Sequence, residues 1–132
     1  MMNTTIAGYY VDELAHWMRL IGFYNREITE FGHKLAEVIQ RNTIPHIAEK
    51  VEAQQSSLDK VSEKFGTLYT LIEKQHAVLK KDHALIDNSL IDEDTNERQN
   101  ELRQQMEQAE KLYLEVKYGC YHFLSETLKK QK

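Results

Sequence analysis

The chain has 132 residues, with 17 lysines and arginines against 21 aspartates and glutamates, so its net charge at pH 7 is −4. This length predicts a single domain over residues 1–132 with its own hydrophobic core. The acidic balance provides no positive field for phosphates and excludes nucleic acid as an expected partner. One proline, five glycines and 29% charged residues favour long, solvated helices over a β-sheet.

The first 23 residues bear on localisation. They have no basic leader, and charged residues such as Asp12, Glu13 and Arg19 interrupt their apolar stretch. This pattern fits neither a signal peptide nor a membrane span. The single cysteine, Cys120, cannot form an internal disulfide, which suits a reducing compartment. We therefore expect a cytoplasmic chain with no membrane partner.

A first helix is predicted over residues 11–41. Apolar residues recur there every three or four positions, namely Leu14, Trp17, Ile21, Tyr24, Ile28, Phe31, Leu35 and Val38. Asn42 and Thr43 break the pattern, and one of them is the expected cap of the next helix. Pro45 would then lie in the first turn of that helix, where its missing N–H costs little.

A second helix is predicted over residues 44–86 and a third over residues 95–130, because the same apolar spacing returns in both. The polar, acidic segment between them is typical of a turn that ends at a helix cap, for which Asp94 and Thr95 are the candidates. The third helix is acidic in its first half and basic in its second half, as the helix dipole favours.

Short connections make consecutive helices antiparallel neighbours. The expected fold is therefore an all-α, elongated, antiparallel three-helix bundle (up-down-up) with coiled-coil-like packing. Folding the chain near residues 43 and 91 would place Trp17 level with Leu68 and Leu112.

Three polar residues interrupt the apolar seam of the second helix, namely Gln54, Gln75 and Asp82. Polar residues at core positions of helical assemblies can fix the register, since other alignments leave them without partners. Alternatively, these three residues lie at seam edges that water reaches.

Three Glu-x-x-His pairs raise the question of a metal site. Di-iron bundles use such pairs, projecting inward from two of their helices. Helical geometry points His16 and His33 toward solvent or the edge of the core, whereas His76 and His83 fall on the core direction of the second helix. Metal or small-ligand binding by Glu73, His76 and His83 is therefore an alternative hypothesis, although the neighbouring helices place no supporting carboxylate at that level.

The second and third helices also carry apolar residues on their outer faces. On the third helix, three of them are i, i+4, i+7 neighbours at about 140° to 160° from the core direction, and on the second helix three recur every seven residues. Such a stripe with tyrosines is typical of a protein interface. Alternatively, the helices of the bundle have wide apolar faces, and the N-terminal segment covers part of this surface. The predicted interface residues are Leu114, Tyr118, Tyr121, Leu71, Val78 and Leu85.

No motif predicts catalysis. The sequence has no Gly-rich phosphate loop, no Cys-x-x-Cys pair and no nucleophile with an inferable histidine partner. We therefore predict a non-enzymatic, cytoplasmic protein without a cofactor. It would act through protein–protein contacts, as a homo-oligomer or as a subunit of an assembly.

Overall fold

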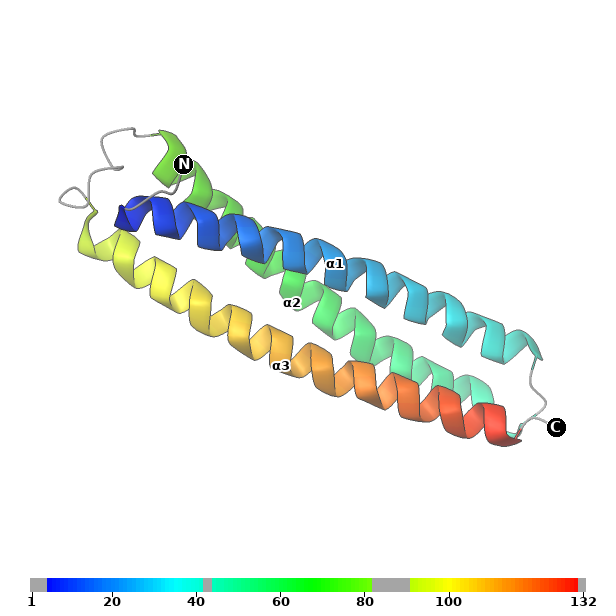
Figure 1. Cartoon of the computed structure of the whole chain (residues 1–132). Coiled ribbons are helices and arrows are strands. Elements are labelled where there is room, and N and C mark those ends of the chain that lie inside the picture. Colours follow the sequence, from blue (N-terminus) through cyan, green and yellow to red (C-terminus); the bar gives the residue numbers. More distant parts are fainter. Residues whose placement is uncertain (1–4, 42–43, 82–90, 131–132) are drawn as a thin grey trace.

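The computed structural model describes residues 5–41, 44–81 and 91–130, which form three long helices packed side by side (Figure 1). The helices are α1 (Ile6–Arg41), α2 (Ile47–Lys81) and α3 (Glu93–Lys130). α1 and α3 run in the same direction and α2 runs back between them, so the bundle is elongated (Figure 1). The predicted all-α, up-down-up three-helix bundle is confirmed. None of the helices in the described ranges is long and apolar enough to cross a membrane.

α1 begins five residues before the predicted start at residue 11. The hydroxyl oxygen of Thr5 accepts a hydrogen bond from the backbone N–H of Gly8 at 3.0 Å, which is the geometry of a helix cap. Ala7 and Gly8 are buried in the first turns. The sequence pattern missed these turns because small residues contribute little to the apolar spacing.

α2 begins at Ile47 rather than at the predicted residue 44. Proline disfavours the helical conformation in the residue before it, so Ile44 stays outside the helix and Pro45 lies in a turn. His46 has a φ of 63°, and the N–H of Ile47 donates to the carbonyl of Ile44 at 3.3 Å. The predicted cap residues and the predicted end of this helix lie outside the described residues, namely Asn42, Thr43 and residue 86.

α3 begins at Glu93, and Asp92 is its cap. The Asp92 carboxylate accepts a hydrogen bond from the N–H of Thr95 at 2.7 Å. Hydrogen bonds from Thr95 lower the pKa of Asp92, because they favour the charged form. The prediction of Asp94 or Thr95 as the cap was wrong by two or three residues, since several residues of this segment are competent caps.

The core follows the predicted apolar spacing, with buried side chains recurring every three or four residues along α1 and α2. At mid-length, one aromatic ring from each helix meets the other two. The ring centroids of Tyr24 and Phe65 are 5.3 Å apart, those of Tyr24 and Tyr113 are 4.8 Å apart, and those of Phe65 and Tyr113 are 6.0 Å apart. These three residues, the aromatic cluster, join α1, α2 and α3.

The alignment of α3 with α1 differs from the prediction. Side chains that bond across these two helices are 86 to 90 residues apart in the sequence. Trp17 is therefore level with residues 103–107 and not with Leu112. Gln75 of α2 bonds Gln99 of α3, so Leu68 is level with a residue near 106 and not with Leu112. Hydrogen bonds between distant residues set this register, and the apolar spacing does not encode them.

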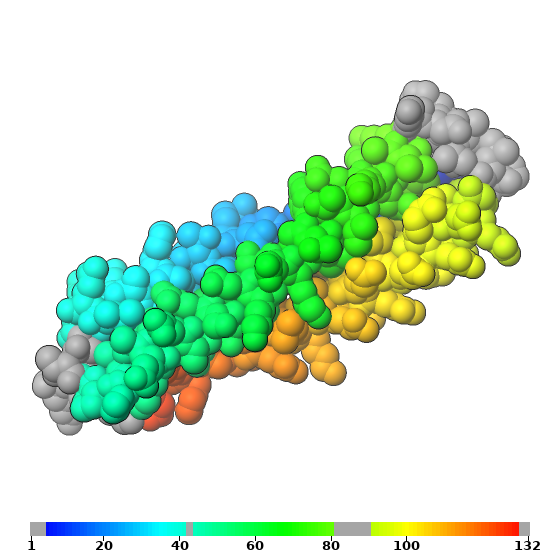
Figure 2. Space-filling view, turned by 180° about the vertical axis from the view of Figure 1, so that it is seen from behind, coloured from blue at the N-terminus to red at the C-terminus, as the bar shows by residue number. Residues whose placement is uncertain are grey.

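The three helix pairs are not equally close. α2 lies across both other helices (Figure 2), and it packs more closely against α1 and α3 than those two pack against each other. The seam between α1 and α3 is therefore the place where long side chains have room to bridge two helices.

Candidate functional site

Long polar side chains bridge α1 and α3 next to the aromatic cluster. The Tyr24 hydroxyl donates to the Glu110 carboxylate at 2.5 Å, and the Tyr113 hydroxyl donates to Glu27 at 2.5 Å. Lys117 Nζ lies 3.2 Å from the same Glu27 carboxylate. Burial, followed by the hydrogen bond to a carboxylate and its charge, raises the pKa of both tyrosines. Both hydroxyls therefore remain donors at neutral pH, and they hold the seam together.

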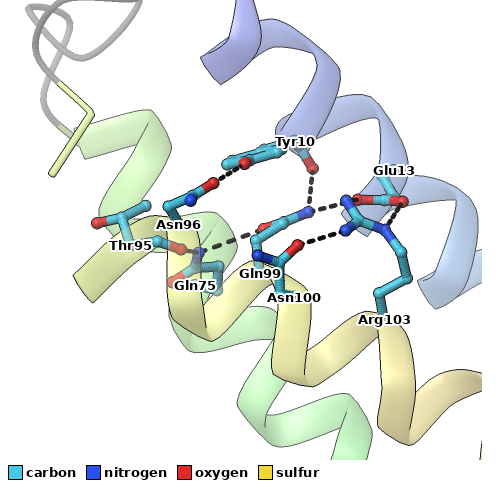
Figure 3. Close-up of polar contacts among 8 residues, drawn as sticks. All are labelled: Tyr10, Glu13, Gln75, Thr95, Asn96, Gln99, Asn100 and Arg103. Carbon is cyan, nitrogen blue, oxygen red and sulfur yellow. Dashed lines mark hydrogen bonds and ion pairs between the residues drawn. The ribbon is translucent and has the colours of Figure 1, made fainter. Parts of the chain in front are cut away.

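A second set of bridges forms a polar layer toward the N-terminal ends of α1 and α3 (Figure 3). The side chains of Gln75, Thr95 and Gln99 are buried there. The Gln75 amide donates to the Thr95 carbonyl at 3.0 Å and to the Gln99 amide oxygen at 3.2 Å. The Gln99 amide in turn donates to the Tyr10 carbonyl at 3.3 Å and to Glu13 at 2.9 Å. This layer therefore connects all three helices.

An ion pair completes the polar layer on its outer side. Arg103 donates to both oxygens of Glu13, from Nε at 2.8 Å and from Nη2 at 2.7 Å (Figure 3). Burial alone would raise the pKa of Glu13, but hydrogen bonds from Arg103 and Gln99 and the charge of Arg103 outweigh it and lower the pKa. Arg103 also donates to Asn100 at 2.6 Å, and the Tyr10 hydroxyl donates to Asn96.

The geometry of the polar layer fits a role in fixing the register. The two amides are saturated with protein partners, because Gln75 also accepts from Arg98 at 3.2 Å. A saturated layer is costly to realign and offers no free reactive group. Gln75 is therefore buried and bonded, as the first of its two alternatives requires, and does not lie at an edge that water reaches. Gln54 accepts a hydrogen bond from the Cys120 thiol at 3.5 Å, and Asp82 lies outside the described residues.

The Glu13–Arg103 pair predicts a pH-dependent contribution to stability. The lowered pKa of Glu13 means that the stabilisation is fully present above the ordinary value of 4.5 and is lost as the pH falls through the lower folded-state value. We expect Glu13→Gln to lower the free energy of unfolding by about 1 kcal/mol at pH 7, because the pair is bidentate and partly buried. Urea unfolding at pH 7 and pH 3 measures the difference.

The difference in the free energy of unfolding between wild type and Glu13→Gln should narrow as the pH falls from 7 to 3. The exposed Glu101→Gln variant is the control, and it should match the wild type at both pH values. A gap of equal size at pH 3 would show that the carboxylate charge is not what stabilises the layer.

The structure describes two of the three candidate metal ligands. Glu73 is exposed and His76 is half-buried, while His83 lies outside the described residues. Burial, followed by the charge of Lys80, lowers the pKa of His76, so its imidazole is neutral at pH 7. Within residues 5–41, 44–81 and 91–130, no three histidine, cysteine, aspartate or glutamate side chains gather in a way that could hold a metal ion.

The predicted interface residues of α2 line a groove beside α3. Leu71 and Val78 are 37% and 43% exposed, and with Leu102 they border a groove of about 200 Å³. Leu85 lies outside the described residues. Since Leu71 is level with residue 103 or so, Leu114 lies about 16 Å further along the bundle. Leu71 and Val78 therefore lie at a different level of the bundle from Leu114, Tyr118 and Tyr121.

The predicted residues of α3 belong to a longer exposed stripe. Leu114, Tyr118 and Tyr121 are 45%, 65% and 47% exposed, and Leu128, seven residues after Tyr121, is 62% exposed. The prediction missed Leu128, although its heptad spacing was the available signal. We call these four residues the α3 outer stripe. The ring of Tyr121 also packs edge-on against Phe31 of α1, with centroids 5.0 Å apart.

A groove between α1 and α3 borders the C-terminal end of the α3 outer stripe. It holds about 180 Å³, and its lining combines apolar and charged side chains, namely Lys34, Glu37, Val38, Arg41, Leu124 and Leu128. The groove makes this part of the surface concave as well as apolar, which a pocket for side chains of another protein requires.

Two features of the described residues therefore bear on function. The polar layer connects all three helices, and the α3 outer stripe leaves apolar side chains exposed beside a groove. No protein-family model, curated protein or solved structure matches this chain.

Proposed function

We propose that this chain is a non-enzymatic, cytoplasmic protein that acts through contacts with protein, as a homo-oligomer or as a subunit of a larger assembly. The observation that carries the proposal is the α3 outer stripe. Four large apolar side chains follow one face of a helix there, and each is 45% exposed or more. Contiguous exposed apolar surface that contains tyrosine is typical of protein interfaces.

Two further observations favour protein contacts over chemistry as the function. The buried amides of Gln75 and Gln99 are engaged in bonds between helices. Cys120 is buried, and burial raises the pKa of its thiol, which disfavours the reactive thiolate. Apart from the contact of Tyr121 with Phe31, no ring contact or hydrogen bond among the described residues engages the α3 outer stripe.

The double variant Leu114→Asp, Tyr118→Asp tests the proposal. Size exclusion with light scattering should give the wild type a mass above the 15.6 kDa of one chain, and the double variant a mass near 15.6 kDa. Burying two carboxylates in an apolar contact is unfavourable, whereas both positions are exposed in the single chain and tolerate a charge. Circular dichroism should show the same helicity for both proteins.

Ile39→Asp is the matched control, because Ile39 is 40% exposed on α1 and lies outside the α3 outer stripe. It should keep the mass of the wild type. If the double variant keeps both the mass and the helicity of the wild type, the α3 outer stripe takes no part in a contact between copies.

A further inference from the structure

Resting on the proposed function, we infer that the partner of the α3 outer stripe is a second copy of this chain. The two α3 helices pack antiparallel about a twofold axis level with Tyr121 and His122. Twofold dimers with one self-complementary surface are the commonest closed assembly of soluble proteins. Both the apolar residues and the charges of this surface are arranged symmetrically about that level.

The α3 outer stripe is self-complementary when one copy is reversed. Leu114 and Leu128 lie seven residues before and after Tyr121. An antiparallel partner therefore places Leu128 of the second copy opposite Leu114 of the first, with the two Tyr121 rings near the axis. The apolar overlap extends over about 21 Å of helix at 1.5 Å per residue.

The charges beside the stripe favour the antiparallel over the parallel arrangement. Glu115, His122 and Lys129 are spaced by seven residues, so they share one flank of α3, and all three are exposed. In the antiparallel pair, Glu115 of each copy faces Lys129 of the other. In a parallel twofold pair, this flank of one copy lies on the opposite side of the contact from the same flank of the other copy, so Glu115 does not meet Lys129.

Lys129 is available for such a contact. Its side chain is 70% exposed, and its Nζ lies 3.5 Å from Glu126 within the same helix. An exposed pair of this kind holds its side chains weakly, so Lys129 can turn toward a second copy at little cost.

The groove between α1 and α3 receives the apolar side chains of the reversed copy. It is lined by residues of both helices and lies level with Leu124 and Leu128. In the antiparallel pair this level faces Leu114 and Tyr118 of the second copy. Each copy thus provides protruding side chains and a groove of about 180 Å³ that receives the side chains of the other copy. By symmetry, this contact occurs twice in the dimer.

Charge reversal tests the inference. Glu115→Lys and Lys129→Glu each turn two attractive contacts per dimer into two repulsive ones, so each should raise the dissociation constant of its homodimer by about tenfold or more. Mixing the two variants at equal concentration restores both attractive contacts in a heterodimer. Sedimentation velocity should then show dimerisation close to that of the wild type.

Glu97→Lys is the matched control. Glu97 is exposed and lies 18 residues, or five full turns, before Glu115, so it points in the same direction. In the antiparallel pair it lies beyond the end of α3 of the second copy, and its reversal should leave the dissociation constant within about twofold of the wild type. Small-angle scattering should also give a dimer about 85 Å long, against about 55 Å for a parallel, in-register pair.

The outcomes separate this inference from the proposed function. If the mixed variants dimerise no better than either variant alone, the antiparallel pairing is wrong, while loss of mass on Leu114→Asp, Tyr118→Asp still supports a contact through the stripe. A wild type that stays monomeric at all concentrations overturns the second copy as the partner. In that case the partner in the proposed function would be a different protein, and the same double variant would test whether that protein binds the stripe.

Discussion

Phe65→Ala is expected to lower the free energy of unfolding by about 3–5 kcal/mol, the range for removing a buried aromatic ring. Phe65 has no exposed surface, and its ring contacts Tyr24 of α1 and Tyr113 of α3. The substitution therefore leaves a cavity at the point where all three helices meet. Stabilities of 5–15 kcal/mol are usual for a domain, so the loss would be a large fraction of the total. Urea unfolding followed by circular dichroism measures it.

Phe23→Ala is the matched control for the aromatic cluster. Phe23 is 46% exposed, and it contacts the edge of Tyr24 with centroids 5.9 Å apart. Loss of this partly solvated ring should lower the free energy of unfolding by about 1 kcal/mol or less, since little apolar area returns to water. Equal losses for the two variants would mean that the cluster does not organise the bundle.

Gln99→Ala is the second substitution with a large expected effect. Gln99 is fully buried, and its amide accepts from Gln75 and donates to Glu13 and to the Tyr10 carbonyl. Truncation leaves buried polar groups short of partners and opens a small cavity. We expect the free energy of unfolding to fall by about 2–3 kcal/mol in urea unfolding at pH 7.

Gln104→Ala is the control for Gln99, because Gln104 is an exposed glutamine on the same helix. Its replacement by a better helix former should change the free energy of unfolding by about 0.5 kcal/mol or less. If Gln99→Ala were as stable as Gln104→Ala, water would be replacing the lost bonds, and the polar layer would not be setting the register.

The two prominent features lie in different parts of the bundle. The polar layer joins the N-terminal parts of α1 and α3 to α2, whereas the α3 outer stripe begins at Leu114, in the second half of α3. Substitutions in the polar layer should therefore change stability, and substitutions in the stripe should change association with little effect on stability. This separation makes the experiments on function independent of those on folding.

The starts of the helices were predicted only in part. Asp92, Asp94 and Thr95 are all residue types that cap helices, and only the bond from the Thr95 N–H to Asp92 distinguishes them. At the start of α2, the restriction that Pro45 places on Ile44 was readable in the sequence, and it outweighs the apolar spacing that continues through Ile44.

The predicted interface residues show what the apolar spacing within one helix can predict and what it cannot. The exposure of Leu114, Tyr118 and Tyr121 follows from their angle to the core direction, which consecutive residues of one helix define. Their separation from Leu71 and Val78 depends on how far α2 and α3 are displaced along each other. No periodicity within a single helix encodes that displacement.

The sequence by itself determined that the chain forms three helices and which face of each helix is buried, because apolar spacing along a helix is a local property. Only the tertiary structure decided the register. Glu13 and Arg103 are 90 residues apart in the chain, and nothing in either helix marks them as partners. Buried polar groups must find specific partners across helices, whereas apolar side chains accept many alignments, so hydrogen bonds between distant residues selected the alignment observed.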